Sequence, residues 1–351
     1  MKQVLFYCFV FSQLISQATL SGFVRDTKTN EPLINAIISV GKHGTYTNAY
    51  GFFSLVIPVN NDSVLVRMIG YSPKKQAIFS NQIQTIFLDE SSFSSDEIDV
   101  VAGKFLPLET IQTGLSTVNV NAMKEFPTIG GEQDVFRMVQ FKNGVSIGKD
   151  VSNAFYVRGG RADQNMILVD GMELYNPSHL LGFLSVLNTE AISSVDLYKG
   201  SIPAQYGGKL SSVMNITIKD GNRSDFKIGG GVSMLSSHLN VEGPHSTKGS
   251  FFFSYRRAYY DYLLALFAEE QQGDAKKAFE DSEFAFSDLL FKANYALGKS
   301  DNFIYNMSLG SDDLMMLRSS GGLRMKLTWK NIGTQLRWTS VWSNTLFSET
   351  A

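Results

Sequence analysis

Cysteine, long hydrophobic runs and an excess of one charge are missing from this 351-residue chain. Cys8 is the only cysteine, which excludes a disulfide framework and a thiolate metal site. The 31 basic and 33 acidic residues give a formal net charge of −2, so the chain lacks the basic surface of a general nucleic-acid binder. A mean hydropathy of −0.04 excludes a bundle of membrane helices. The length predicts two or three domains at about 150 residues each.

Residues 1–18 have the features of a cleaved secretory signal peptide. Lys2 precedes an apolar run at residues 4–11, and Ser16 and Ala18 form a small-x-small site. The run is too short to cross a bilayer as a helix, and no small residue follows Cys8, which argues against a lipoprotein anchor. A buried N-terminal strand or helix is the alternative. The sequence therefore predicts export and a mature chain without cysteine.

Residues 19–90 alternate short apolar runs with Gly, Asn and Pro turns, which predicts a small β-sandwich. The order of the motifs resembles the carboxypeptidase-regulatory-like domain. The matching residues are 22–26, 31–33, 44–48, 51–53 and 70–71. We interpret this domain as a binding or spacer module.

The sequence offers no constellation for catalysis or for a metal. A zinc peptidase needs clustered ligands, commonly His and Glu a few residues apart. None of the four histidines has such a neighbour, so each is expected to be solvated or packed in a core: His43, His179, His238 and His245. We therefore assign no catalytic residue, cofactor or metal ligand, and a periplasmic hydrolase is disfavoured.

Residues 91–112 are predicted to be a linker. The first part is small and polar, as in flexible connectors. A short β-prone run then follows, made of Glu97, Ile98, Asp99, Val100 and Val101. An extended segment of this kind can add a strand to the sheet edge of a partner. An edge strand of a neighbouring domain and plain linker are the alternatives.

Residues 113–221 predict an α+β domain with glycines at its turns. A short helix is expected within residues 133–140, and strands at 166–169 and 195–198. Asp170 and Gly171 fit a tight hairpin turn. Neither a phosphate-cradling glycine spacing nor a GxSxG nucleophile elbow is present.

Several motifs of this domain, in order over about 110 residues, closely resemble the plug domain of TonB-dependent outer-membrane receptors. They are residues 156–160, 163–171, 175–177 and 195–213. Lys209 stands where the family more often has Arg, which keeps the charge but loses the planar fork. In such receptors the regulatory-like domain precedes the plug, and residues 97–101 fall where a TonB box would lie.

Residues 222–351 show apolar and polar residues in alternation, in segments rich in aromatics. Phe291, Tyr295, Phe303 and Tyr305 belong to this pattern, and all three tryptophans lie here. We count roughly seven strands, with a turn near Asn331 after which the register restarts at Ile332. Such segments predict a transmembrane β-barrel, with one face toward lipid and one toward a polar interior. The alternative is an antiparallel sandwich with one wet face.

The connections test this prediction. Short inner turns are expected at residues 243–248, 298–301 and 330–333, and longer outer loops at 257–283 and 311–321, as the barrel rule requires. The short connection near residues 236–237 departs from it. Plugged transporters have about 22 strands, so we expect the chain to hold only the start of an incomplete barrel. The fold class is thus mainly β: a small sandwich, an α+β plug and an incomplete antiparallel transmembrane β-barrel.

The resemblance implies a receptor of the cell outer membrane for energy-coupled uptake of a siderophore, vitamin, oligosaccharide or peptide. The implied partners are TonB with ExbB and ExbD, outer-membrane lipid and the ligand. Some receptors of this kind also have a surface lipoprotein as a partner. The structural motifs of the plug are placed at Arg158, Gly159, Gly160, Arg161, Asp170, Gly171, Tyr206, Gly207 and Gly208. Their glycines permit tight turns, and their charges are expected to pair within the plug or with the barrel wall.

One further cluster has two interpretations. Its residues either touch a ligand or pack at the membrane interface, and they are Arg256, Arg257, Tyr259, Tyr260 and Tyr262. As a rival function, the chain is a secreted or surface binding module, an adhesin that uses the β-sandwich to hold a glycan or protein.

Overall fold

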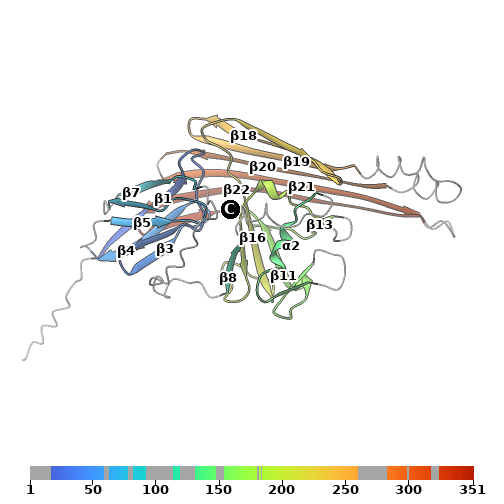
Figure 1. Cartoon of the computed structure of the whole chain (residues 1–351), viewed down its shortest axis with the longest axis horizontal. Helices are drawn as coiled ribbons and strands as arrows, with labels where there is room; N and C mark the ends of the chain where they lie inside the picture. Colours follow the sequence, from blue (N-terminus) through green and yellow to red (C-terminus); the bar gives the residue numbers. More distant parts are fainter. Residues whose placement is uncertain are drawn as a thin grey trace, which may run out of the picture.

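The computed structural model shows three parts that contact one another (Figure 1). It describes residues 17–58, 63–77, 82–91, 114–118, 131–147, 154–179, 182, 184–259, 283–298, 300–317 and 324–351. The predicted signal peptide (all but its last two residues) and the candidate TonB box at residues 97–101 lie outside these ranges. Within them, no helix combines the length and hydropathy needed to cross a membrane.

The N-terminal sandwich is built from two packed sheets. One sheet has the order β4(Phe52–Pro58), β1(Gln17–Asp26), β7(Ile83–Leu88). The other has the order β3(His43–Tyr46), β2(Ile37–Val40), β5(Ser63–Arg67), β6(Lys74–Ala77). Alternate residues of β5 and β7 are buried, and Leu20, Ile38 and Ile86 lie in the core between the sheets. The predicted β-sandwich is confirmed, although β3 begins inside the turn expected at residues 41–44.

The central domain is the predicted α+β unit. Its main sheet has the order β12(Met172–Glu173), β11(Asn165–Val169), β16(Ser212–Ile218), β15(Ile192–Tyr198), β8(Leu115–Val118). The helix α2(Val135–Val139) packs its apolar side chains into the same core, and its N-cap Asp134 accepts hydrogen bonds from the amides of Phe136 and Arg137. The remaining short elements are β9(Val145–Ile147), β10(Phe155–Val157), η2(Ala162–Gln164), β13(Ser178–His179), β14(Leu184–Ser185) and η4(Thr189–Ala191).

The predicted hairpin turn in this domain is confirmed. Val169 pairs with Met172 across Asp170 and Gly171, whose φ angles are 48° and 83°. Two consecutive positive φ angles are what a two-residue type I′ turn requires, and Asp-Gly is a favoured pair for it.

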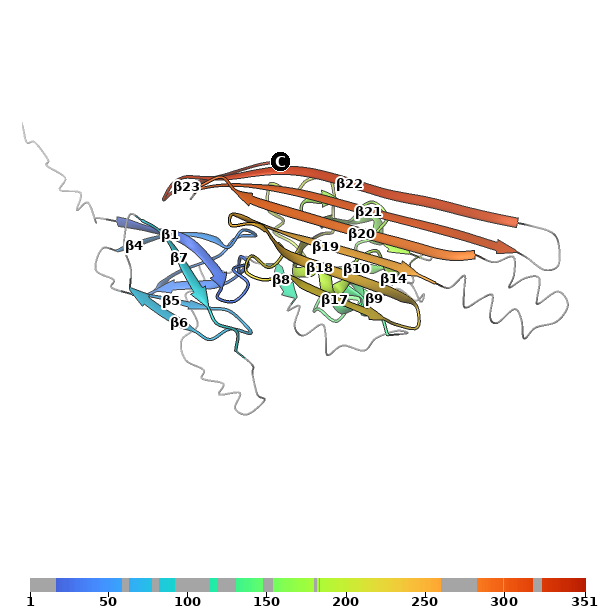
Figure 2. The same ribbon diagram turned by 90° about the horizontal axis from the view of Figure 1, so that it is seen from above.

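The long sheet covers the central domain. Its strands follow one another in chain order and are all antiparallel, and Figure 2 shows the longest of them running from the sandwich to the far end of the molecule. The strands are β17(Lys227–Val232), β18(Ser236–Ser246), β19(Gly249–Ala258), β20(Glu283–Ala296), β21(Asp301–Leu317), β22(Arg324–Ser343) and β23(Leu346–Thr350). The described residues thus contain the expected seven strands.

The predicted turn near Asn331 is wrong. β22 continues through this position, and Asn331 pairs with Gly310 of β21. The outer loop expected at residues 311–321 is also too long, because β21 continues to Leu317. Before Asn331 the apolar residues of β22 point inward, and after it they point outward. The alternation therefore shifts by one residue because the outward face changes from polar to apolar, not because the chain turns.

Candidate functional site

The two faces of the long sheet have opposite polarity. On the face toward the central domain, Lys292 and Arg337 are 4% and 7% exposed. On the opposite face, Ile332 and Leu336 are 74% and 63% exposed. A sheet that folds in water buries its apolar face and exposes its polar one. The long sheet instead exposes apolar side chains on its outer face and buries charged ones, beside apolar ones such as Phe252, on its inner face.

The outward face changes from apolar to polar at one level of the sheet. Residues that pair directly across strands lie on the same face. One row of such neighbours is apolar or aromatic: Leu239, Tyr255, Leu289, Leu309 and Ile332. The next outward row, farther from the sandwich, is polar: Ser237, Arg257, Ser287, Ser311 and Lys330. The apolar surface therefore ends along a common line on five strands.

Aromatic residues occupy the other end of the apolar surface. Tyr295, Phe303 and Trp338 are cross-strand neighbours, and the rings of Phe303 and Trp338 stack with centroids 6.1 Å apart. Trp342 follows at the end of β22 and is exposed. From Ile332 to Trp342 the strand has about 11 residues, the length of a tilted transmembrane β-strand. Aromatics at the edge of such a band are typical of membrane interfaces.

A buried lysine joins the inner face of the sheet to the central domain. The ammonium of Lys292 lies 2.8 Å from Asp220 and 3.3 Å from Asp170, and it donates to the carbonyl of Ile218 at 3.0 Å. Burial raises the pKa of Asp170 in spite of Lys292. Burial alone would raise the pKa of Asp220 too, but Lys292 and Arg223 lower it. Asp220 is therefore the carboxylate that holds its charge against Lys292. We call these three residues the lysine cluster.

A second buried cluster lies farther from the sandwich. The imidazole of His179 on β13 contacts Asp312 at 2.7 Å and Asp288 at 2.8 Å, on strands β21 and β20. Arg256 of β19 pairs with Asp288 at 2.7 Å and donates to the carbonyl of Ser185. Burial alone would lower the pKa of His179, but the charge of Asp288 and the hydrogen bonds to both carboxylates raise it. We call these four residues, His179, Asp288, Asp312 and Arg256, the histidine cluster.

Close backbone approaches accompany the clusters. A Cβ on Gly171 would lie 2.7 Å from the guanidinium of Arg337, which donates to the carbonyl of Asp170. A Cβ on Gly221, whose φ is 85°, would lie 2.1 Å from the carbonyl oxygen of Phe251 on β19. A side chain at Gly221 would displace the backbone of β19, whereas one at Gly171 would displace only the Arg337 side chain, and the positive φ at both positions favours glycine. The central domain therefore fits the inner face closely.

The sandwich contacts both other parts. Ser21 and Ser54 donate to Asn344, in the turn between β22 and β23, and the ring of Phe52 stacks on Phe347 with centroids 5.1 Å apart. The amide of Asn35 donates to the carboxylate of Asp196 in the central domain at 2.9 Å.

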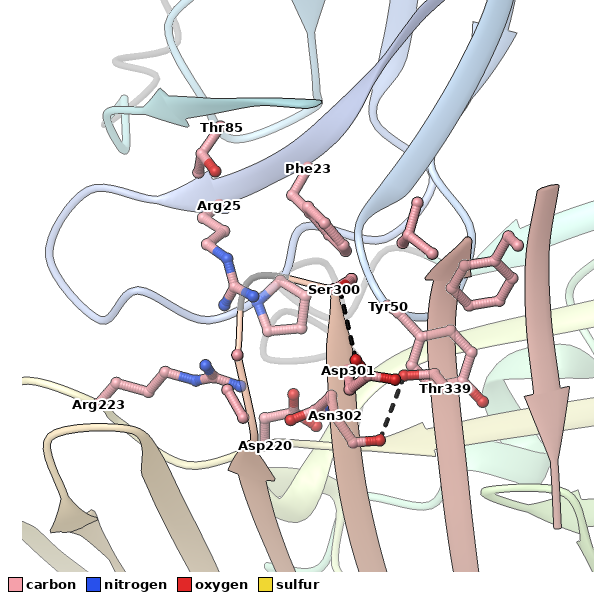
Figure 3. Close-up of a pocket in the computed structure, with 15 residues that line it drawn as sticks. Phe23, Arg25, Tyr50, Thr85, Asp220, Arg223, Ser300, Asp301, Asn302 and Thr339 are labelled. Carbon is pink, nitrogen blue, oxygen red and sulfur yellow. Dashed lines mark hydrogen bonds between the residues drawn. The ribbon is translucent and has the colours of Figure 1, made fainter. Parts of the chain in front are cut away.

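A cavity of about 120 Å³ remains between these parts (Figure 3). Arg25 from the sandwich and Arg223 from the segment before β17 both line it, with Asp220 between the long sheet and Arg223. Burial and the like charge of Arg223 lower the pKa of Arg25 to about 10. The interface thus places two like charges near one another, with the carboxylate of Asp220 beside them.

The predicted motif residues fall into two groups. Asp170 and Gly171 lie against the long sheet, as described above. The others lie away from the two clusters: Arg158, Gly159, Gly160, Arg161, Tyr206, Gly207 and Gly208. Arg161 pairs within the domain with Asp163 at 3.0 Å, and Gly160 approaches Ser211 so closely that a Cβ would lie 2.3 Å from its hydroxyl. Tyr206 contacts the ring of Tyr198 at 5.5 Å.

The sequence singled out two of the cluster residues, Asp170 and Arg256, and missed Lys292, Asp220, Asp288 and Asp312. Lys292 and Asp312 stand on the polar phase of their strands, so the alternation could have placed them on the inner face. Asp220 left no such signal. In the cluster with two interpretations, Arg256 is 2% exposed, packs over the ring of Phe286 at 5.1 Å and faces the central domain, not a membrane interface. Tyr260 and Tyr262 lie outside the described residues.

Comparison with known families gives two matches. Residues 20–101 match the CarboxypepD_reg-like domain, and residues 108–213 match the TonB-dependent Receptor Plug Domain. No curated protein matches the chain.

The solved structures that the chain resembles include one receptor and two transporters. The ferric enterobactin receptor of Pseudomonas aeruginosa, as a mutant, is 13% identical, with 66% of this chain and 39% of that chain covered and a TM-score of 0.44. The outer membrane transporter YddB of Escherichia coli is 12% identical, with 65% and 37% covered and a TM-score of 0.49. The copper transporter OprC is 12% identical, with 67% and 35% covered and a TM-score of 0.44. The chain spans less than half the length of each.

Proposed function

Because the chain carries a CarboxypepD_reg-like domain followed by a TonB-dependent receptor plug domain, we propose that it forms part of an outer-membrane receptor. This receptor takes up a ligand with energy supplied through TonB. The long sheet is a section of the barrel wall, and the central domain is the plug inside it. ExbB and ExbD energise TonB from the inner membrane. We assign the chain no catalytic role.

The observation that carries the proposal is the inverted polarity of the long sheet. Its inner face holds buried charges that pair with the central domain, such as Lys292 with Asp220. Its outer face is apolar over about 11 residues of β22 and polar beyond Lys330. An apolar band with an aromatic edge fits lipid, and a polar lumen fits a plug. A secreted adhesin has no use for such a band.

The position of the sandwich indicates which end of the long sheet faces the periplasm. The sandwich and the candidate TonB box both precede the central domain in the chain, and the sandwich lies beside the turn between β22 and β23. This end therefore faces the periplasm, where TonB can reach residues 97–101. The polar outward rows beyond Ser311 and Lys330 then extend past the outer surface of the membrane.

Uptake requires that the contacts of the lysine and histidine clusters break or rearrange. Together they hold the central domain against β20 and β21 by buried ion pairs, and against β19 by the bond that Arg256 donates to Ser185. Breaking such a pair leaves an uncompensated charge, at a cost of about 3–5 kcal/mol. Passage of a ligand beside the plug therefore needs an external energy source, which TonB provides. The ligand is a siderophore, vitamin, oligosaccharide or peptide.

Fractionation of cells that express the full-length gene tests the location. We expect the protein in the outer membrane, extractable only with detergent. A soluble periplasmic product would support the binding-module alternative instead.

Deletion of residues 97–101 in the full-length gene tests the coupling. The purified periplasmic domain of TonB should bind the unaltered receptor and lose most of its affinity for the deletion variant. Deletion of residues 92–96, an equally long part of the same linker, is the control and should leave binding unchanged. Equal binding to both variants would reject residues 97–101 as the TonB box.

A further inference from the structure

Asp196 lies where three segments of the chain meet. It is buried in β15, opposite Thr117 of β8, and its carboxylate accepts a hydrogen bond from the Thr117 hydroxyl at 2.7 Å. The same carboxylate oxygen accepts from the amide of Asn35 in the sandwich at 2.9 Å. One buried carboxylate thus connects the sandwich to the sheet of the central domain.

The strand β8 is a short edge strand of that sheet. It has four residues and, among the described strands, pairs with β15 alone. It is also the first described strand after residues 92–113, which join the sandwich to the central domain. A short edge strand opens at low free-energy cost, so any side-chain contact that holds it has a large relative effect.

Asn35 is a rigid donor for this contact. Its neighbour Ala36 is in the sandwich core, and the backbone amides of Asn35 and Ala36 both donate to Thr47. Its φ angle is 61°, a left-handed conformation that Asn tolerates better than most residues. The backbone that carries the Asn35 side chain is therefore held in place where this side chain reaches Asp196.

The rest of the sandwich interface is built to separate. Apart from the aromatic contacts of Phe52 and Tyr50 with Phe347, its contacts are polar, such as the bonds of Ser21 and Ser54 to Asn344 and of the Gly221 amide to Glu31. It encloses the cavity of Figure 3, and Arg25 and Arg223 place like charges around it. Polar, incompletely packed interfaces between domains permit relative motion.

We propose that the docked sandwich is a releasable brace on β8, acting through the hydrogen bonds that Asn35 and Thr117 donate to Asp196. While the sandwich is docked, Asp196 is fixed and holds Thr117, so β8 stays paired. When the sandwich leaves, the carboxylate loses one donor and β8 opens more readily. In the receptor proposed above, the sandwich thereby sets how easily the plug begins to open; this consequence rests on that function, whereas the brace does not.

Amide hydrogen exchange on the full-length receptor, without any ligand, tests the brace. Asn35→Gly removes the donor and keeps the left-handed backbone. We expect the amides of residues 115–118 to exchange roughly tenfold faster, as for loss of a hydrogen bond to a charged group. Asn30→Gly is the matched control: Asn30 also has a positive φ, 57°, in the same domain. It should leave β8 unchanged.

A charge swap separates the brace from general damage to the sandwich. Asn35→Asp places a second carboxylate against Asp196 and should accelerate exchange in β8 at least as much as Asn35→Gly. Adding Asp196→Asn restores a donor–acceptor pair and should bring the exchange back toward the unaltered rate. Two results would overturn the brace. One is an equal exchange rate of the β8 amides in Asn35→Gly and Asn30→Gly; the other is an exchange rate that Asp196→Asn does not restore in the Asn35→Asp variant.

The exchange experiments can confirm the brace even if the receptor does not bind TonB or does not reach the outer membrane. That combination would reject the proposed function and leave this inference unchanged. The two hypotheses therefore fail separately.

Discussion

The central domain and the sandwich both contact the long sheet, but in different ways. The central domain meets the sheet through buried ion pairs, with Lys292 and Arg256 almost inaccessible to water and Gly221 against the backbone of β19. The sandwich meets it through the hydroxyls of Ser21 and Ser54 and the stacked ring of Phe52, beside a cavity. Breaking a buried ion pair exposes an uncompensated charge, whereas separating polar surface groups returns them to water. The central domain is thus held firmly, and the sandwich reversibly.

Of the changes proposed here, loss of Lys292 should weaken the contact between the central domain and the long sheet the most. Lys292→Ala leaves Asp170 and Asp220 buried without their cation, so the free energy of unfolding of the central domain should fall by about 3–5 kcal/mol. Urea titration followed by hydrogen exchange in β11 and β16 measures it. Lys330→Ala, on the exposed outward face, should change it by less than about 0.5 kcal/mol. Equal effects of the two substitutions would refute a charge-dependent contact.

The histidine cluster should make the same contact sensitive to pH. The pKa of His179 is raised in the folded protein, so protonated His179 stabilises the contact fully below its ordinary value of 6.5. That stability is lost as pH rises through the raised pKa. The urea midpoint of the central domain should therefore fall from pH 6.5 upward, and His179→Asn should remove this slope.

His43→Asn, on the exposed strand β3 of the sandwich, is the control and should keep the slope. A midpoint with the same pH dependence in all three proteins would show that His179 does not titrate in this contact.

The docking of the sandwich should also weaken as pH rises, but to a smaller extent. Burial, Glu242 and Asp220 raise the pKa of Glu31 to about 7, against the lowering effects of Lys219 and Thr29. The docked state therefore binds a proton that the free sandwich releases above its ordinary pKa of 4.5, and docking weakens between pH 4.5 and 7. Spin labels at Lys42 and Thr345 should report fewer docked molecules at pH 8 than at pH 5.

Glu31→Gln should abolish this change, whereas Glu90→Gln, at an exposed acid of the same domain, should not. A docked population that depends on pH equally in both variants would assign the titration to another group.

Particular elements show how far the sequence leads. Alternation placed Phe303, Tyr305 and Ile332 on one face of the sheet, and the Asp170–Gly171 turn followed from backbone sterics alone, because both depend on residues close in the chain. The phase change at Asn331 was misread as a turn, since a strand that leaves a membrane and a strand that ends produce the same local pattern. The pairing of Lys292 with Asp220 joins residues of different domains, and no local pattern encodes it.

The central claim is that the outward face of the long sheet lies in lipid while its inward face holds the plug. Spin labels at Ile332→Cys and Leu336→Cys in a Cys8→Ser full-length receptor, reconstituted in bilayers, test it most directly. Electron paramagnetic resonance should show both labels colliding with oxygen dissolved in the membrane and shielded from a water-soluble nickel chelate. Labels that collide with the chelate and not with oxygen would place this face in water and contradict the account.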